Sequence, residues 1–275
     1  MKRFIATAVI GSLISGVAFA QTETNVVSSA NIVGYVQTAT QASNKYEMVS
    51  LTQFSTGSNT VNIQSLFANR DNLRSGMVLT NVDRLITWNG ATYTTYGLYK
   101  SNSVGPFWMG SGPAWTVPGV AKTASAAQLA RGQAAWFQAA RFFPATNVVA
   151  SGNVFMDGTY SVKLNGKYMM VSYPYSADIS LNKLVVTNSY AGQVLTNVDR
   201  IITWNGATYT TYGLYQSNSV GPFWMGSGPA WTVPGVAKTP STATLNLGKG
   251  FWYLTSSTGT TKTIGFSCIY TNLLQ

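Results

Sequence analysis

Short runs in which apolar and polar residues alternate occupy most of the chain, and Gly, Asn and Pro separate them. Alternation with a period of two is typical of β-strands, and the chain is rich in the strand formers Thr, Val and Tyr. The pattern therefore predicts an all-β fold. Beyond the apolar N-terminal run, only residues 64–68 have a helical pattern, and this segment is short enough to form a single turn.

The clearest local element is a β-hairpin with strands at residues 84–88 and 91–96. Asn89 and Gly90 lie between these strands. Asn-Gly is the preferred pair for a two-residue type I′ turn, because both positions need a positive φ. The sequence therefore predicts a tight hairpin here and another at the copy of this segment, residues 200–212.

A two-residue turn fixes which side chains of the hairpin face each other. It places Trp88 opposite Ala91 and Ile86 opposite Tyr93. Ile86, Trp88 and Tyr93 then share one apolar face, which we expect to be part of the core. The same expectation holds for the corresponding residues of the second hairpin, Trp204 and Tyr209.

A block of 46 residues occurs twice, at residues 78–123 and 194–239, with only two differences. The similarity continues on both sides of the block, so the chain contains two tandem repeats. We expect a first domain at residues 21–145 and a second at 146–275. Residues near 146 are either the start of the second repeat or the closing strand of the first. Each domain is expected to be a β-sandwich or a partly closed barrel.

The first 20 residues have the pattern of a signal peptide. Lys2 and Arg3 form a positively charged start, an apolar run follows to residue 17, and Ala18-Phe19-Ala20 resembles a cleavage site. The apolar run is too short to favour a membrane span, and no transmembrane segment is expected elsewhere. The mature protein is therefore expected to be exported to the periplasm, the cell surface or the medium.

The composition excludes most catalytic chemistry. The chain has no histidine, the commonest general base and zinc ligand, and only seven acidic residues. Each copy of the block has one acid, Asp83 or Asp199, whereas a glycosidase needs two facing carboxylates. We expect no enzymatic activity, catalytic residue, metal site or cofactor. Cys268, the one cysteine, cannot form an intramolecular disulfide and is expected to be a buried apolar residue.

The chain is basic, with a formal net charge of +10. Beyond the N-terminal pair, Lys and Arg are scattered singly, which argues against a dedicated nucleic-acid groove. The charge has two interpretations. It attracts the protein to an acidic polysaccharide or another anionic envelope surface, or it serves only to keep a protein with few charged residues soluble.

Residues 104–120 differ from the rest of the chain, because Gly and Pro repeatedly interrupt any strand pattern. Long irregular loops often carry function, and exposed aromatic rings can stack on the apolar faces of sugars. The candidate ligand-binding residues are the aromatic residues of this loop and its copy: Phe107, Trp108, Trp115, Phe223, Trp224 and Trp231. Two alternatives remain open. The rings could cover one end of the fold as core, or dock onto a neighbouring subunit in self-association.

Several motifs resemble those of small, repeated β-domains in bacterial exported and cell-surface proteins. Residues 166–174 are similar to an opening strand G-x-Y-x-x-V-S-x-P, and W-x-G-x-x-Y occurs at residues 88–93 and 204–209. Residues 247–252 are similar to a closing strand rich in Gly, Phe and Trp, from which the first repeat departs at Ala134. The resemblance implies an exported β-fold with non-catalytic work at the cell surface or envelope, and it implies no ligand residues.

These observations favour an exported, non-enzymatic structural or adhesion protein of the envelope or extracellular space. Tandem copies suit such a role, because a repeated module gains in avidity. The alternative is a carbohydrate-binding protein that contacts its ligand through the aromatic loop residues.

Overall fold

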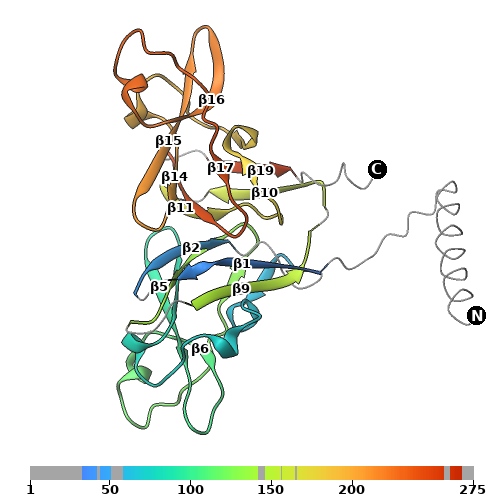
Figure 1. Cartoon of the computed structure of the whole chain (residues 1–275), viewed down its shortest axis with the longest axis vertical. Coiled ribbons are helices and arrows are strands. Elements are labelled where there is room, and N and C mark those ends of the chain that lie inside the picture. The colour runs from blue at the N-terminus through green and yellow to red at the C-terminus, as the bar shows by residue number, and fades with distance from the viewer. Residues whose placement is uncertain are drawn as a thin grey trace, which may run out of the picture. The chain divides into compact units, whose positions relative to one another are not determined.

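Strands form nearly all the regular structure of the protein, as the alternating pattern predicts (Figure 1). This computed structural model describes residues 33–41, 44–50, 58–141, 146–155, 157–164, 166–256 and 261–267. The expected signal peptide and Cys268 lie outside these ranges. The helices within them are 3₁₀ helices of three residues each. None of the described helices is long and apolar enough to cross a membrane.

The first repeat is built around a five-stranded antiparallel sheet with the order β2-β8-β4-β5-β6. Its strands are β2 (Tyr46–Ser50), β8 (Ala134–Gln138), β4 (Arg84–Trp88), β5 (Tyr93–Tyr99) and β6 (Phe107–Gly110). Two strand pairs accompany it: β3 (Thr60–Asn62) with β7 (Gln128–Ala130), and β1 (Val33–Gln41) with β9 (Thr146–Asn153). The short helices are η2 (Ile63–Ser65), η3 (Arg70–Asn72), η4 (Leu79–Asn81) and η5 (Pro113–Trp115).

The second repeat has a five-stranded sheet of the same order, β11-β18-β14-β15-β16. Its strands are β11 (Tyr168–Ser172), β18 (Gly250–Leu254), β14 (Arg200–Trp204), β15 (Tyr209–Ser217) and β16 (Val220–Gly226). The smaller sheets are β12 (Ile179–Ser180) with β17 (Thr244–Leu245), and β10 (Thr159–Leu164), β19 (Lys262–Ser267) and β13 (Val185–Thr187) in the order β10-β19-β13. The short helices are η6 (Leu181–Lys183), η7 (Leu195–Asn197) and η8 (Pro229–Trp231).

Strand β9 closes the first repeat. It pairs with β1 in antiparallel register, and the two lie side by side in Figure 1. Strand β19 pairs with β10 in the same way at the end of the second repeat. In this pairing the residues near 146 form a strand of the first repeat, which is one of the two placements that the sequence left open, and the division at residues 145/146 stays a prediction. The described residues of both repeats belong to one compact unit.

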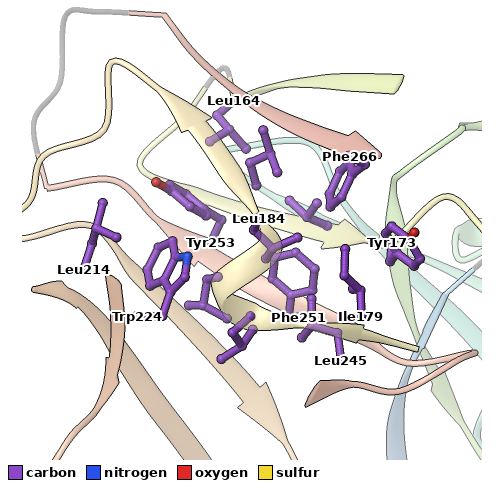
Figure 2. Packing of buried hydrophobic residues seen from close by; sticks show 14 of the residues in the cluster. Leu164, Tyr173, Ile179, Leu184, Leu214, Trp224, Leu245, Phe251, Tyr253 and Phe266 are labelled. Atoms are coloured by element: carbon purple, nitrogen blue, oxygen red, sulfur yellow. The ribbon is translucent and has the colours of Figure 1, made fainter. Parts of the chain in front are cut away.

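In each repeat, one face of the five-stranded sheet packs against the smaller strands. The sheets remain separate, and none of them closes into a barrel within the described residues. In the second repeat, Tyr253 and Phe251 of β18 meet Ile179, Leu245 and Phe266 of the smaller strands (Figure 2). A corresponding cluster in the first repeat joins Leu85 and Phe137 to residues of β3, β7 and β9.

The hairpin prediction is correct in position and wrong in register. Strand β4 has the expected bounds, but the loop is two residues longer, so that Trp88 pairs with Tyr93 instead of Ala91. Gly90 has a φ of 101°, whereas Asn89 is not among the residues with positive φ. Instead, the Asn89 side chain accepts hydrogen bonds from the backbone N–H groups of Ala91 and Thr92. This is an Asx-type turn, which Asn stabilises through its carbonyl oxygen.

Candidate functional site

Two tryptophans join the repeats in matching ways. The indole N–H of Trp88 donates to the backbone carbonyl of Tyr168 at 2.8 Å, and that of Trp204 donates to the carbonyl of Tyr46 at 3.0 Å. Each tryptophan ends the first strand of its hairpin, so the duplicated hairpins reach reciprocally from one repeat to the other. These bonds fix the planes of both indole rings.

The backbones of the two repeats also meet in a reciprocal arrangement. Ser50 N–H donates to the carbonyl of Gly248, and Ser172 N–H donates to that of Gly132, both at 2.8 Å. A cluster centred on Met48, Met170 and the rings of Trp136 and Trp252 fills the space between them. The second face of each large sheet is therefore covered in part by the other repeat.

An open groove lies at this junction. Its volume is about 460 Å³, and residues of both repeats line it. The first repeat supplies Trp88 and Tyr93, and the second supplies the remainder: Tyr168, Ile202, Tyr209, Thr211 and Trp252. The groove is a composite feature, since neither repeat alone contains the whole lining.

The aromatic rings of the groove contact one another and remain accessible. Trp88 and Tyr93 lie 4.6 Å apart between ring centroids, and Trp252 meets Trp88 edge-on at 6.1 Å. Tyr93 and Tyr209 are each 55% exposed, and Tyr168 is 41% exposed. Large rings held in place by their neighbours, with faces open to solvent, are typical of binding surfaces.

The lining of the groove is uncharged. None of its lining residues is acidic or basic. Desolvation raises the pKa of the Tyr93 and Tyr209 hydroxyls above the ordinary value, with the neighbouring Tyr209 contributing in the case of Tyr93. The hydroxyls are therefore neutral hydrogen-bond donors at ordinary pH. The groove offers flat apolar faces and a few hydroxyl groups to a ligand.

The aromatic residues proposed from the sequence lie in a different place. Trp108 and Trp224 are 0% and 1% exposed, and Trp115 and Trp231 are also buried. Their rings belong to the core or to the packing beneath the Gly-Pro loops. This agrees with the alternative in which the rings cover one end of the fold as part of the core. A ring without an exposed face cannot stack on a ligand, so burial argues against ligand contact through the Trp108 and Trp224 rings.

Amide side chains hold the strand that contains Trp108. The Gln64 side chain accepts a hydrogen bond from Trp108 N–H at 2.8 Å and donates to its carbonyl at 2.7 Å. Asn182 accepts from Trp224 N–H in the second repeat. These contacts occupy backbone groups at the outer edge of each large sheet, which would otherwise be open to another strand.

Phe107 and Phe223 are half-buried, and each packs against a tyrosine of the adjacent strand. Phe223 and Trp224 also line a hollow of about 270 Å³ beside β13. This hollow lies within the second repeat and does not include the exposed rings of the junction. It is a weaker candidate than the groove because the Trp224 ring offers almost no surface.

The exposure of the two sets of rings differs from what the sequence predicts. Trp88, Tyr93, Trp204 and Tyr209 were expected to be core, but the two tyrosines are largely exposed and the tryptophans are half-buried at the junction. One sequence signal could have indicated this. Strand β4 has apolar side chains on both faces, with Leu85 on one and Ile86 and Trp88 on the other, so its second face also required a partner.

The most strongly buried charges form a structural cluster. Asp199 and Lys262 are both fully buried, and Lys262 Nζ lies 2.5 Å and 2.7 Å from the two carboxylate oxygens. Burial alone would raise the pKa of Asp199, but hydrogen bonds from Lys262, Ser256, Tyr190 and Tyr253 hold it below the ordinary value. Burial and the charge of Asp199 raise the pKa of Tyr253. Neither of the two charged side chains, Asp199 and Lys262, is exposed to solvent.

The identical residue of the first repeat lies in different surroundings. Asp83 accepts hydrogen bonds from the backbone N–H groups of Arg74 and Ala140, but a phenylalanine, Phe137, stands where the second repeat has Tyr253. Burial therefore dominates and raises the pKa of Asp83. Within the described part of the chain, no group of three or more His, Cys, Asp or Glu residues could hold a metal ion.

Compared with known proteins, the chain matches no family model, no curated protein and no solved structure at a significant level. The all-β fold and the aromatic groove at the junction of the repeats therefore carry the functional argument.

Proposed function

We propose that this chain is an exported, non-enzymatic adhesion module that binds polysaccharide through the aromatic groove between its two repeats. The single observation that carries the proposal is the composite, uncharged lining of Trp and Tyr side chains. Sugar rings have flat apolar faces edged by hydroxyl groups. Flat aromatic rings and neutral tyrosine hydroxyls complement both features.

The size of the groove supports this interpretation. About 460 Å³ lies within the roughly 300–1,000 Å³ that is usual for sites of small ligands. Exposed faces at Tyr93, Tyr168 and Tyr209 leave it open, so that a longer chain of sugars could pass across it. Export, which rests on the N-terminal pattern of the sequence, would bring the protein to extracellular glycans.

The test is a pull-down of the purified protein on a panel of insoluble neutral and acidic polysaccharides. We expect the wild type to be retained, and a Tyr93→Ala/Tyr209→Ala variant to be released. Tyr190→Ala is the matched control, because Tyr190 is 54% exposed and is not among the residues that line the groove. Retention of the groove variant at the wild-type level would contradict the assignment of the site.

Self-association is the second candidate function. The observation in its favour is a set of exposed apolar side chains outside the groove: Met77 at 60%, Val78 at 54%, Val185 at 66% and Val194 at 54%. Light scattering of the same sample separates the two candidates. Monomers that bind polysaccharide support the adhesion module, whereas assembly without ligand and without polysaccharide binding supports self-association.

A further inference from the structure

A second recess, more polar than the groove, lies at the junction of the repeats. Its volume is about 310 Å³. Glu47 comes from β2 of the first repeat, while Trp204, Asn205 and Lys249 come from the second. Other residues of the second repeat complete its lining: Thr203, Thr244, Leu245, Asn246 and Gly250.

An ion pair between the repeats forms one wall of this recess. Lys249 Nζ lies 2.5 Å from Glu47 Oε1, and the side chains are 30% and 9% exposed. This contact engages Oε1, and Glu47 lines the recess. A carboxylate has lone pairs on both oxygens, so Oε2 can accept a hydrogen bond from a ligand in the recess.

The charged wall is present on one side of the junction only. At the positions that correspond to Glu47 and Lys249, the other repeat has Met169 and Gln133. The mutual contacts of the backbones are the same on both sides, with isolated bridges at Val49–Lys249 and at Gln133–Val171. The backbone contacts on the opposite side thus form without these charges, and the shared backbone docking does not explain why one side has them.

The recess adjoins the aromatic groove. Trp204 lines the recess and Tyr209 lines the groove, and their ring centroids lie 4.7 Å apart. The Trp204 ring therefore connects a ligand on Tyr209 to the recess that contains the ion pair. The Trp204 ring is fixed beside the recess by its hydrogen bond to the Tyr46 carbonyl.

We infer that the recess is a polar subsite of the polysaccharide site, which selects sugar units with a free vicinal pair of hydroxyls. One hydroxyl donates to Glu47 Oε2, and the neighbouring hydroxyl oxygen accepts from Lys249 Nζ. An adjacent carboxylate and ammonium match the adjacent donor and acceptor of a diol, and Trp204 supplies an apolar surface for the ring. This inference rests on the proposed function of the groove and adds the selectivity of that site.

The experiment replaces the two charged residues by the residues that the other repeat has at the corresponding positions. A Glu47→Met/Lys249→Gln variant has the residues that the chain already accommodates on the opposite side, so it should fold, and its thermal unfolding is measured to check this. Calorimetric titrations use cellohexaose and β-1,4-linked mannohexaose, in which every residue has free hydroxyls at C2 and C3, and chitohexaose, in which C2 is N-acetylated and only the non-reducing end keeps a vicinal pair, at C3 and C4. Lys100→Gln is the control for loss of charge, because the second repeat has Gln216 at that position.

We expect the wild type to bind cellohexaose or mannohexaose more tightly than chitohexaose. The exchange should weaken binding of cellohexaose and mannohexaose about 10-fold or more, as expected for the loss of charge-assisted hydrogen bonds, and should weaken binding of chitohexaose much less, because only its terminal residue has such a pair. Lys100→Gln should bind like the wild type. Equal affinity of wild type and exchange variant would overturn the subsite and leave the groove intact. If the wild type is retained on polysaccharide but binds none of the three hexaoses, the subsite is also wrong, whereas failure of the wild-type pull-down contradicts the proposed function itself.

Discussion

The methyl group of Ala134 occupies the space that a side chain at position 250 would need. A Cβ atom built on Gly250 would lie 2.4 Å from the Cβ of Ala134 and 2.8 Å from the Cγ of Met48. Ala134 and Gly250 are counterparts in the two repeats, so the junction accepts one methyl group at this point and not two. Ala134, at which the first repeat departs from the closing-strand motif, thus fills the space that Gly250 leaves empty in the second repeat.

Gly250→Ala should therefore destabilise the protein by about 1–3 kcal/mol, the usual cost of overpacking a tight contact. Adding Ala134→Gly should restore much of the loss, because the single methyl group then projects from the other repeat. Urea unfolding of the wild type, both single variants and the double variant measures the coupling between the two sites. Additive effects would show that the two residues do not compete for the same space.

Asp199→Asn should cost about 3–5 kcal/mol at neutral pH, because it leaves the Lys262 ammonium buried without its counter-ion. The pKa of Asp199 is lowered in the folded protein, so the carboxylate stabilises the fold fully above the unfolded pKa of about 3.9. This contribution is lost as the pH falls through the lowered folded pKa. Urea midpoints of wild type and variant, measured from neutral to acidic pH, should therefore converge below about pH 4.

The same residue in the first repeat should show the opposite pH dependence. Burial raises the pKa of Asp83, so the ionised carboxylate opposes folding at neutral pH. This cost is relieved as the pH falls through the raised folded pKa towards the ordinary value. The wild type should thus gain stability relative to Asp83→Asn on mild acidification. Parallel trends for the Asp83 and Asp199 variants would mean that the two environments are alike.

The alternating pattern and the duplication were sufficient to predict the all-β class and the positions of β4 and β14, because these depend on local periodicity and on turn residues. The register of the hairpin was not predictable, since Asn-Gly fits both a two-residue turn and the four-residue Asx turn that the structure contains.

The groove could not be found from either repeat alone. Its lining joins Trp88 and Tyr93 to residues more than 70 positions further along the chain, and this depends on how the repeats dock. The burial of Trp108 in the Gly-Pro loop could not be predicted for a related reason. The irregular sequence of the loop resembles that of an exposed binding loop, but Gln64 anchors the backbone of Trp108 from outside the loop, and the ring turns into the core.

Asn89→Ala should destabilise the first hairpin by about 1 kcal/mol, because it removes two side-chain acceptor bonds in the turn. Asn89→Asp keeps an acceptor oxygen at the same position and should cost less. The structure gives the reason as hydrogen bonding, since Asn89 does not have a positive φ. Thermal unfolding of both variants decides the matter, and an equal loss for Ala and Asp would show that the acceptor is unimportant.

The last prediction separates the core rings from the groove rings. Trp108→Ala removes a fully buried ring that packs against Phe67, and it should cost about 3–5 kcal/mol. Such a loss is a large part of the stability of a typical domain. Trp224→Ala in the second repeat should behave in the same way.

Tyr93→Ala should cost far less, because more than half of that side chain is already exposed to solvent. Its effect should instead be seen in polysaccharide retention, which Tyr190→Ala leaves unchanged. Chemical unfolding of the full chain, measured beside the pull-down, gives both quantities for each variant. A Trp108→Ala protein that remains as stable as the wild type but no longer binds polysaccharide would contradict the groove as the binding site and would place the site at the Gly-Pro loops. A Tyr93→Ala protein that unfolds as readily as Trp108→Ala would show that the rings of the groove hold the repeats together instead of binding a ligand.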